Sequence, residues 1–521
     1  MNSTTDIVTT SQDSYWSFIW KESANRKSLL LGIGLCIIQF VIFKLLYPFP
    51  DFFGDSYSYI FAASAHLDIS IWPIGYSKFL DWFHAITHSD TALVAFQYFF
   101  LQAAALHFYF TIIYFFKVKR VTQTILFLFL FINPLSLYLC NTVNSDALFA
   151  ALTLLWLIQM IWIVQRPRLY QVLIQAILLF LCFTVRNNAY YYPAVTVIAY
   201  LLTKQSWKVK LGGILMPFFF LVPFIIYTEQ AAFKITGIRQ YSLFTGWQLA
   251  NNALYIYDRI EQDSLALPTP AAKEVNRLTL SFLKHVNEEE YRSLLETYVG
   301  NFFIREPNAP LKRYFGSHYQ HLHSEMALTA AWGKASADFE PFGKAVILQH
   351  PMAYTWYFIR PNILHYFLPP LSHIERYNYG TNEIDPIARD WFGYPNSTVH
   401  CISHSLQGFL IIYEAFFLLF NLYFLWQLAK YLINYKRVHL TSENDRVMWA
   451  VAAFLLLNFL FSIVTTVNIL RYQVVPMAIL LSFGALLNDH LSELVPGKKP
   501  HLISKSPIIA DQKTNLLQKD I

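Results

Sequence analysis

The sequence predicts an all-α polytopic membrane protein with about ten transmembrane helices and a large extracytoplasmic loop domain. Of its 521 residues, 55% are hydrophobic and only 14% are charged, whereas about 25% are charged in soluble domains. Apolar stretches long enough to cross a bilayer recur along the chain. Four cysteines in so long a chain exclude a disulfide-based fold, and the sequence has no CxxC or Cys/His zinc pattern.

Ten apolar segments are the predicted membrane spans. Polar residues Arg186, Asn187 and Asn188 divide one apolar run into two short pieces, so we expect a tight turn there. The ten spans are residues 28–47, 91–116, 121–140, 146–165, 170–185, 188–203, 211–228, 405–430, 447–466 and 472–488.

The positions of the basic residues predict the orientation of the chain. Most Lys and Arg outside the long loop fall in segments that share one side with the polar N-terminus, whereas the short outer loops hold only Lys78, Arg186 and Arg471. By the positive-inside rule both termini are cytoplasmic. This topology accounts for the net charge of +6 without a nucleic-acid partner.

Four parts follow from this topology. An N-terminal transmembrane module, residues 1–228, includes a first outer loop at residues 48–90. Residues 229–404 form an extracytoplasmic domain, in which Trp- and Tyr-rich helices lie at the membrane surface. The C-terminal transmembrane helices at 405–490 and a cytoplasmic tail at 491–521 complete the chain.

Two aspartates in the first outer loop are candidates for catalysis. If a helix begins after Gly54, Asp55 and Tyr59 share one face, and a carboxylate at the lip of a membrane cavity suits a general base. The alternative is that Asp51 or Asp55 only caps the helix.

Three further polar residues lie at the outer ends of predicted spans. Asp146 is predicted to cap the fourth span, together with or instead of Ser145. Arg186 and Arg471 each stand at an outer helix end, where a guanidinium can bind a phosphate with two hydrogen bonds. The alternative for both arginines is contact with lipid headgroups.

The long loop holds weaker candidates. Trp247, Asn251 and Asn252 combine an aromatic ring with amides, as sugar-binding sites do. His321 and Glu325 share a helical face and suit a metal, although a solvated amphipathic face is the more common meaning of such a pair. Near the return to the membrane, four histidines could bind or gate a substrate, namely His365, His373, His400 and His404.

Five segments, in order along residues 30–490, are similar to motifs of the GT-C fold glycosyltransferases. This superfamily includes the protein O-mannosyltransferases and the lipid A aminoarabinose transferase. The first segment is the loop with the aspartate pair Asp51 and Asp55, and the second is Pro73-Ile74-Gly75-Tyr76-Ser77-Lys78-Phe79-Leu80, which resembles PGY-x-x-L. The other three are Asn133-Pro134 with Asn144-Ser145-Asp146-Ala147-Leu148-Phe149 (NP…SE-x-L-F), Arg186-Asn187-Asn188 (RPN) and Arg471-Tyr472-Gln473-Val474-Val475-Pro476 (RY-x-x-P).

The resemblance implies a transferase that passes a sugar from a polyprenyl-phosphate donor to a glycan, lipid or protein acceptor with inversion. It implies that Asp55 is the base, with Asp51 assisting or holding a divalent cation, and that the lipid phosphate contacts Arg186, Arg471 and Tyr472. Further substrate contacts fall on Tyr59, Tyr76, Asp146, Trp247, Asn251, Asn252 and His373.

The chain also departs from the pattern of this superfamily. Asp146 stands where glutamate is usual, and Asn187 replaces the proline of RPN. The large loop lies between the seventh and eighth spans instead of after the helices. These departures are typical of a divergent bacterial branch, so we expect the bacterial inner membrane.

Two other functional classes are compatible with about ten spans and a large loop. A polysaccharide polymerase or O-antigen-type ligase would use the outer arginines and histidines such as His373. A lipid or glycan transporter is disfavoured by the near absence of acidic residues within the spans. The sequence has no Walker A, GxGxxG, GxSxG or HExxH motif, which argues against a nucleotide-driven pump. A non-catalytic membrane scaffold remains the simplest alternative.

Overall fold

The computed structural model describes residues 14–262, 265–297, 300–319, 324–435, 442–465 and 467–492. Throughout these residues the regular structure is helical, and β-pairing is confined to isolated bridges such as Asp51 with Thr142. Most of the cytoplasmic tail predicted at 491–521 lies outside the described residues.

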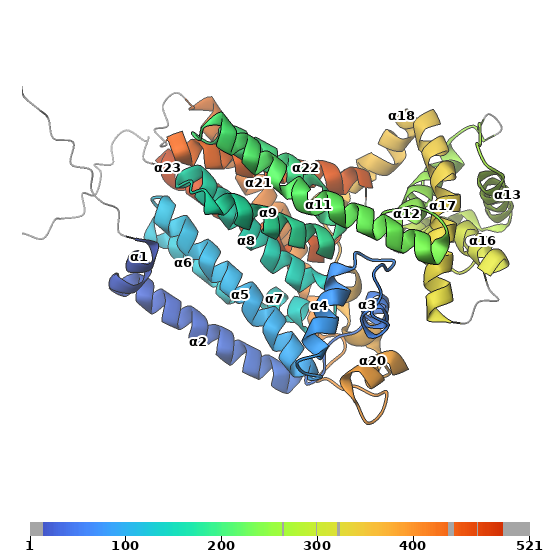
Figure 1. Ribbon diagram of the computed structural model, residues 1–521, viewed down its shortest axis with the longest axis horizontal. Coiled ribbons are helices and arrows are strands. Elements are labelled where there is room, and N and C mark those ends of the chain that lie inside the picture. Colours follow the sequence, from blue (N-terminus) through green and yellow to red (C-terminus); the bar gives the residue numbers. More distant parts are fainter. Residues whose placement is uncertain are drawn as a thin grey trace, which may run out of the picture.

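Eight helical segments in the described residues are long and apolar enough to cross a membrane, so the chain is an all-α integral membrane protein. They run side by side in one bundle (Figure 1). They are α2 (Ser23–Leu46), α5 (Asp90–Phe115), α6 with α7 (Arg120–Phe131 and Pro134–Asn141), α8 (Ser145–Gln165), α11 (Trp207–Thr236), a 3-10 turn with α21 (Leu406–Ile411 and Ile412–Ile433), α22 (Ser442–Thr465), and a 3-10 turn with α23 (Leu470–Gln473 and Val474–Ser492).

The two remaining predicted spans form helices that are shorter than a bilayer requires. They are α9 (Tyr170–Val185) and α10 (Tyr192–Leu202). The tight turn expected between them is present as the 3-10 helix Asn187–Tyr191. With about 1.5 Å of rise per residue, each covers less than the roughly 30 Å of hydrocarbon. The sequence therefore located all ten helices, but only eight have spanning length.

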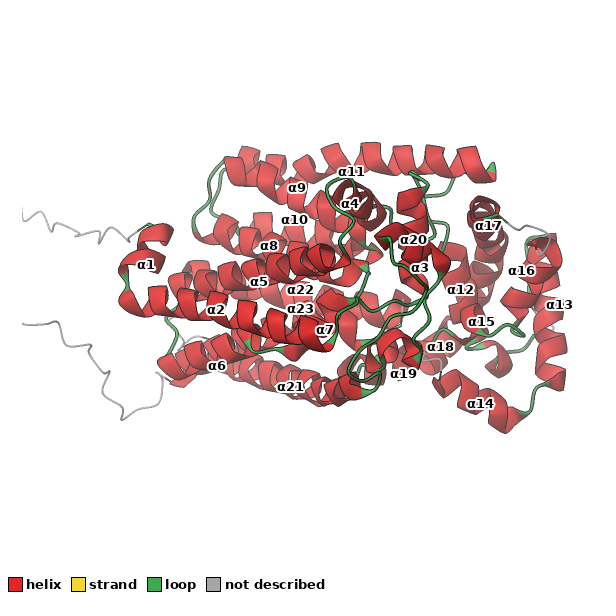
Figure 2. Cartoon of the chain, turned by 90° about the horizontal axis from the view of Figure 1, so that it is seen from below, coloured by secondary structure: helices red, strands yellow, loops and turns green. Residues whose placement is uncertain are grey.

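The bundle is built around α8 and α23, which are the most buried of the eight segments, whereas α2 and α11 lie at its periphery. Both central helices are apolar on every side, as expected of helices surrounded by other helices. Figure 2 shows α11 along one edge of the bundle and α6 and α21 along the opposite edge.

A second hydrophobic core lies beside the bundle. Its helices include α12 (Thr245–Leu254), α13 (Pro270–His285), α15 (Phe302–Arg305), α16 (Pro310–Tyr319) and α17 (Glu325–Gln349). Helix α14 (Glu288–Thr297) lies next to them (Figure 2). Within the predicted 229–404 domain, the described residues that are buried in this core run from Trp247 to Phe358. Buried side chains from Tyr366 to Val399 pack instead against the membrane bundle.

Close packing of α12 on α17 depends on Gly246. A Cβ built at this position would lie 1.7 Å from the Ser336 carbonyl oxygen, which is backbone. We expect Gly246→Ala to lower the free energy of unfolding by about 3 kcal/mol or more, since overpacking of this kind forces the backbone to move. Gly316→Ala, in α16 of the same core, is the matched control because nothing lies within 4 Å of its Cβ. Equal unfolding temperatures for the two variants would contradict this packing.

Short segments gather at the end of the bundle opposite α1 (Tyr15–Lys21), as Figure 1 shows for α3, α4 and α20. They are α3 (Gly54–Ser64), α4 (Gly75–His84), the 3-10 helices Ser372–Glu375 and Tyr377–Gly380, and α20 (Pro386–Phe392). The second core connects to this end through α18 (Pro351–Tyr354), a π-helical turn (Thr355–Ile359) and α19 (Arg360–Phe367). The resulting arrangement places the first outer loop next to the start of α8 and of α23.

Candidate functional site

Four charged side chains from distant parts of the sequence meet at this end of the bundle. Asp146 in the first turn of α8 forms ion pairs with Arg186, which follows α9, and with Arg471 in the turn before α23. Arg471 Nη1 lies 3.0 Å from Asp146 Oδ2. Its Nη2 lies 3.5 Å from Asp55 Oδ2 in the first turn of α3. We call these four residues the charged cluster.

The members of the charged cluster differ in exposure. The side chains of Asp146 and Arg471 are each 4% exposed and that of Arg186 is 12% exposed, whereas Asp55 is 27% exposed. Two buried guanidiniums balance two carboxylates, which offsets the large cost of removing charge from water. Asp55 is therefore the more accessible carboxylate of the cluster.

Aromatic rings cover the two guanidiniums. The Arg186 guanidinium carbon lies 4.4 Å from the ring centre of Tyr472, and that of Arg471 lies 5.2 Å from the same ring. The Arg471 guanidinium also lies over Phe53, at 4.9 Å. Cation–π contacts of this kind fix the planes of both guanidiniums.

Two predicted tyrosines support the cluster from behind. The Tyr59 hydroxyl lies 2.9 Å from Ser145 Oγ, which also accepts a hydrogen bond from Arg186 at 3.2 Å. Tyr76 packs edge-on against Tyr59 and donates to Gln97 Oε1 at 2.8 Å, so it lies one layer further from the charges.

The capping alternatives for the acidic residues are wrong. Helix α3 begins at Gly54 with Phe53 as its N-cap, and α8 begins at Ser145 with Asn144 as its N-cap. Asp55 and Asp146 therefore lie inside the first turns. Their carboxylates face the arginines, while a negative charge in the first turn also interacts favourably with the helix dipole.

A narrow cavity of about 20 Å³ adjoins the cluster between α8, α10, α22 and α23. A space of this size holds about one water molecule. Arg471 Nε is buried nearby without a hydrogen-bond partner among the described residues. A buried N–H of a charged group without an acceptor costs free energy, so this N–H can bind an acceptor that enters the site. The cavity is lined by Asp146, Phe149, Ala150, Thr153, Arg186, Asn188, Tyr191, Tyr192, Phe454, Asn458, Arg471, Tyr472, Val474, Val475 and Pro476.

Asp51 lies apart from the charged cluster and has a structural role. Its side chain is buried, and it accepts hydrogen bonds from the Asn378 backbone N–H at 2.8 Å and from Gln407 at 3.4 Å. Its backbone pairs with residues 141–143 before α8. The expectation that Asp51 assists Asp55 is corrected accordingly, since both of its oxygens hold loops together.

Burial raises the pKa of Asp51 to about 7, against partial compensation by these hydrogen bonds. Between about pH 4 and 7 the folded protein keeps a proton on Asp51 that the unfolded chain releases. The stability that Asp51 contributes is therefore fully present below about pH 4 and is lost as the pH rises to about 7. We expect Asp51→Asn to remove this pH dependence, which changes the free energy of unfolding by up to about 1.4 kcal/mol for each pH unit. Thermal unfolding of both proteins between pH 4 and 8 measures it, and identical pH profiles would contradict this role.

Trp247, Asn251 and Asn252 do not lie at the charged cluster. All three are fully buried in α12, where Trp247 packs in the second core and donates to the Trp332 carbonyl oxygen at 3.0 Å. Asn251 donates to the Gly300 carbonyl oxygen at 2.8 Å. The expectation of sugar contacts is corrected, because these side chains serve the packing of the core.

His373 does reach the cluster, and it brings a residue that the sequence did not indicate. Its ring stacks on Phe53 with centres 5.5 Å apart, and its Nε2 accepts a hydrogen bond from Arg305 in α15. Burial, and then the charges of Arg305 and Arg471, lower the pKa of His373 to about 2. Of the other histidines, His404 holds Tyr377 and Asn382, which is a structural contact.

Metal binding stays a prediction. Within the described residues there is no group of three His, Cys, Asp or Glu side chains that could hold a metal ion. His321 lies outside the described residues, and its proposed partner Glu325 is in the first turn of α17.

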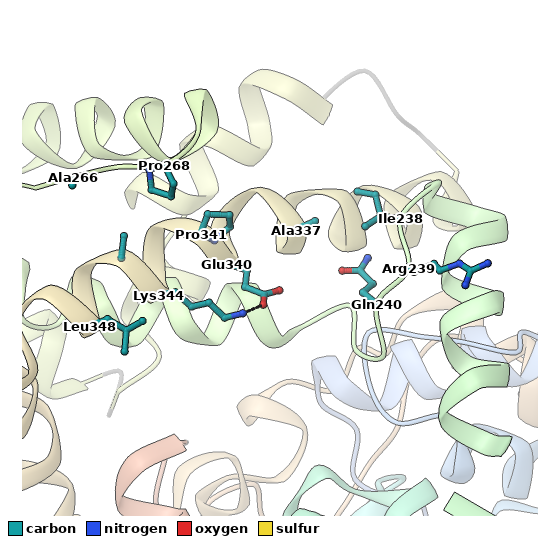
Figure 3. A pocket seen from close by; sticks show the side chains of 11 residues that line it. Ile238, Arg239, Gln240, Ala266, Pro268, Ala337, Glu340, Pro341, Lys344 and Leu348 are labelled. Atoms are coloured by element: carbon teal, nitrogen blue, oxygen red, sulfur yellow. Dashed lines mark hydrogen bonds and ion pairs between the residues drawn. The ribbon is translucent and has the colours of Figure 1, made fainter. Parts of the chain in front are cut away.

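A cavity of about 430 Å³ lies on the second core (Figure 3). Residues 238–240, Pro268 and α17 line it, and Glu340 forms an ion pair with Lys344 along its wall. None of its lining residues belongs to the charged cluster.

Comparisons of the chain with protein families, with curated proteins and with solved structures find no match. A function for the charged cluster must therefore come from the chemistry of its residues and from the motifs in the sequence.

Proposed function

We propose that the chain is a membrane glycosyltransferase that moves a sugar from a polyprenyl-phosphate donor to an acceptor hydroxyl. The observation that carries this proposal is the pairing of an accessible carboxylate, Asp55, with a buried arginine, Arg471, whose Nε has no acceptor in the part of the chain that the structure describes. A base for the acceptor and a cation for the leaving phosphate are the two groups that such a transfer needs.

In the proposed reaction Asp55 removes the proton from the acceptor hydroxyl as its oxygen attacks the anomeric carbon. The bond between that carbon and the phosphate oxygen breaks, and the phosphate leaves with the electron pair. One displacement inverts the configuration of the sugar. Arg471 and Arg186 stabilise the negative charge that grows on the phosphate. The phosphate ester is already activated, so no nucleotide is needed.

Asp146 is a positioning residue in this proposal. Both of its oxygens are engaged, one by Arg186 and one by Arg471. It therefore orients the two guanidiniums instead of contacting the sugar, which refines the substrate-binding role that the resemblance implies. A guanidinium has more N–H donors than its pairing with one carboxylate oxygen uses. Both arginines therefore keep hydrogen-bond donors for a phosphate.

The proposed site lies on the outer side of the membrane. It is at the end of the bundle opposite α1, and the positive-inside rule places the N-terminus in the cytoplasm. A polyprenyl donor would approach through the bilayer, and the acceptor, a glycan, lipid or protein, would come from outside. The bacterial inner membrane fits both substrates. Since the cavity holds about one water, the surrounding helices must separate to admit a sugar.

Transfer of label by the purified protein in lipid vesicles tests this function. The donors are radiolabelled polyprenyl-phosphate sugars, with polyprenyl-pyrophosphate glycans in a parallel series, and the acceptor is a crude envelope extract. We expect transfer from a monophosphate donor. Transfer only from pyrophosphate glycans would favour the ligase or polymerase, and no transfer from any donor would contradict the proposal.

A further inference from the structure

Arg305 is a cation beside the charged cluster that has no carboxylate partner among the described residues. It is the last residue of α15, and the preceding residues Phe302, Phe303 and Ile304 are buried in the second core. Their burial fixes the helix, while the Arg305 side chain itself is exposed. The second core thus presents one arginine to the membrane bundle.

A continuous series of contacts connects Arg305 to the cluster. Arg305 donates to His373 Nε2, the His373 ring stacks on Phe53, and the Arg471 guanidinium lies over the same Phe53 ring. Tyr379 lies edge-on to His373, and its hydroxyl accepts from the backbone N–H of Gly54, next to Asp55. Arg305 therefore lies on the Asp55 side of the cluster.

His373 does not neutralise Arg305. Arginine only donates hydrogen bonds, so His373 Nε2 must be the acceptor and its proton must be on Nδ1. The lowered pKa of His373 keeps the ring uncharged at neutral pH. The two carboxylates and two arginines of the cluster sum to zero charge, and Arg305 adds one positive charge beside it.

The backbone next to His373 is strained in a way that favours a functional role. Asn378 and Tyr379 both adopt left-handed conformations, with φ of 46° and 54°. Such conformations are unfavourable in residues other than glycine and are concentrated at binding and catalytic sites. Here they hold the half-exposed Tyr379 ring between His373 and the start of α3.

We propose that Arg305 binds the phosphate of the polyprenyl-phosphate donor, and that the second core thereby completes the donor site. This inference rests on the proposed function. A sugar phosphodiester carries one negative charge, which matches the single excess charge that Arg305 supplies. In this proposal the phosphate contacts Arg305 and also accepts from Arg471 Nε, which has no acceptor among the described residues.

Binding of polyprenyl phosphate to the full chain in nanodiscs tests the role of Arg305. We compare the wild type with Arg305→Gln and with Arg313→Gln, an exposed arginine on α16 of the same second core. We expect Kd to rise about tenfold or more for Arg305→Gln, as for other hydrogen bonds to charged groups, and to stay unchanged for Arg313→Gln. Arg305→Lys, which keeps the charge, should lie between the two.

The outcomes separate this inference from the proposed function. Wild-type affinity in Arg305→Gln would overturn the role of Arg305 and leave the transferase intact. If Arg305→Gln weakened the binding of inorganic phosphate but not of the lipid, the anion would not be the donor, and the proposal would also fail. A wild type that binds no polyprenyl phosphate would contradict the proposed function itself.

Discussion

Asp55→Asn is expected to lower the rate of sugar transfer by about 10²–10⁴-fold, because the amide cannot accept the acceptor's proton. The side chain keeps its shape, and Arg471 keeps its buried partner Asp146. We therefore expect little change in folding. The measurement is the initial rate of label transfer in lipid vesicles at equal amounts of folded protein.

Asp51→Asn is the matched comparison, since it changes an aspartate four residues earlier that lies outside the cluster. It should keep most of the transfer rate. Loss of transfer in Asp51→Asn with normal transfer in Asp55→Asn would reverse the roles assigned to the two aspartates. Equal rates in all three proteins would remove both from the chemistry.

Asp146→Asn is expected to cause the largest loss of stability. The change leaves buried Arg186 without its carboxylate and buried Arg471 with only the partly exposed Asp55. Removing one partner of a buried ion pair typically costs about 3–5 kcal/mol, because the remaining charge stays desolvated. Thermal unfolding followed by tryptophan fluorescence in nanodiscs measures the effect, and transfer activity should be lost with it.

Asp68→Asn provides the control for Asp146→Asn. Asp68 pairs with Lys78 at 3.1 Å, but both side chains are substantially exposed. Exposed pairs contribute about 0–1 kcal/mol, so the unfolding temperature should barely change. Similar shifts in the two variants would show that the charged cluster is not buried in the way described.

The membrane helices and the individual polar residues at their ends could be located from the sequence because both have strong local signals. A charged residue at the end of an apolar span is costly unless it has a partner or a function, so Asp146, Arg186 and Arg471 stand out. Their convergence with Asp55 could only be expected from the resemblance. The structure brings these four together.

Other parts of the site had no such signal. Trp247 and Asn251 pack in the second core, and buried aromatics and amides have the same composition as a sugar site. Asp51 resembles Asp55 in the sequence, and only the position of Asn378, more than 300 residues away, distinguishes them. Arg305 is one of many arginines in a long loop, and its importance depends on where α15 docks.

A cryo-electron microscopy structure of the protein with bound polyprenyl phosphate tests the central claim most directly. The account predicts a phosphate oxygen within hydrogen-bond distance, about 2.7–3.0 Å, of Arg471 Nε. It also predicts the prenyl chain leaving toward the bilayer and the Asp55 carboxylate facing the space for the sugar. A phosphate bound elsewhere, with Arg471 Nε still unpartnered, would contradict the assignment of the charged cluster as the donor site.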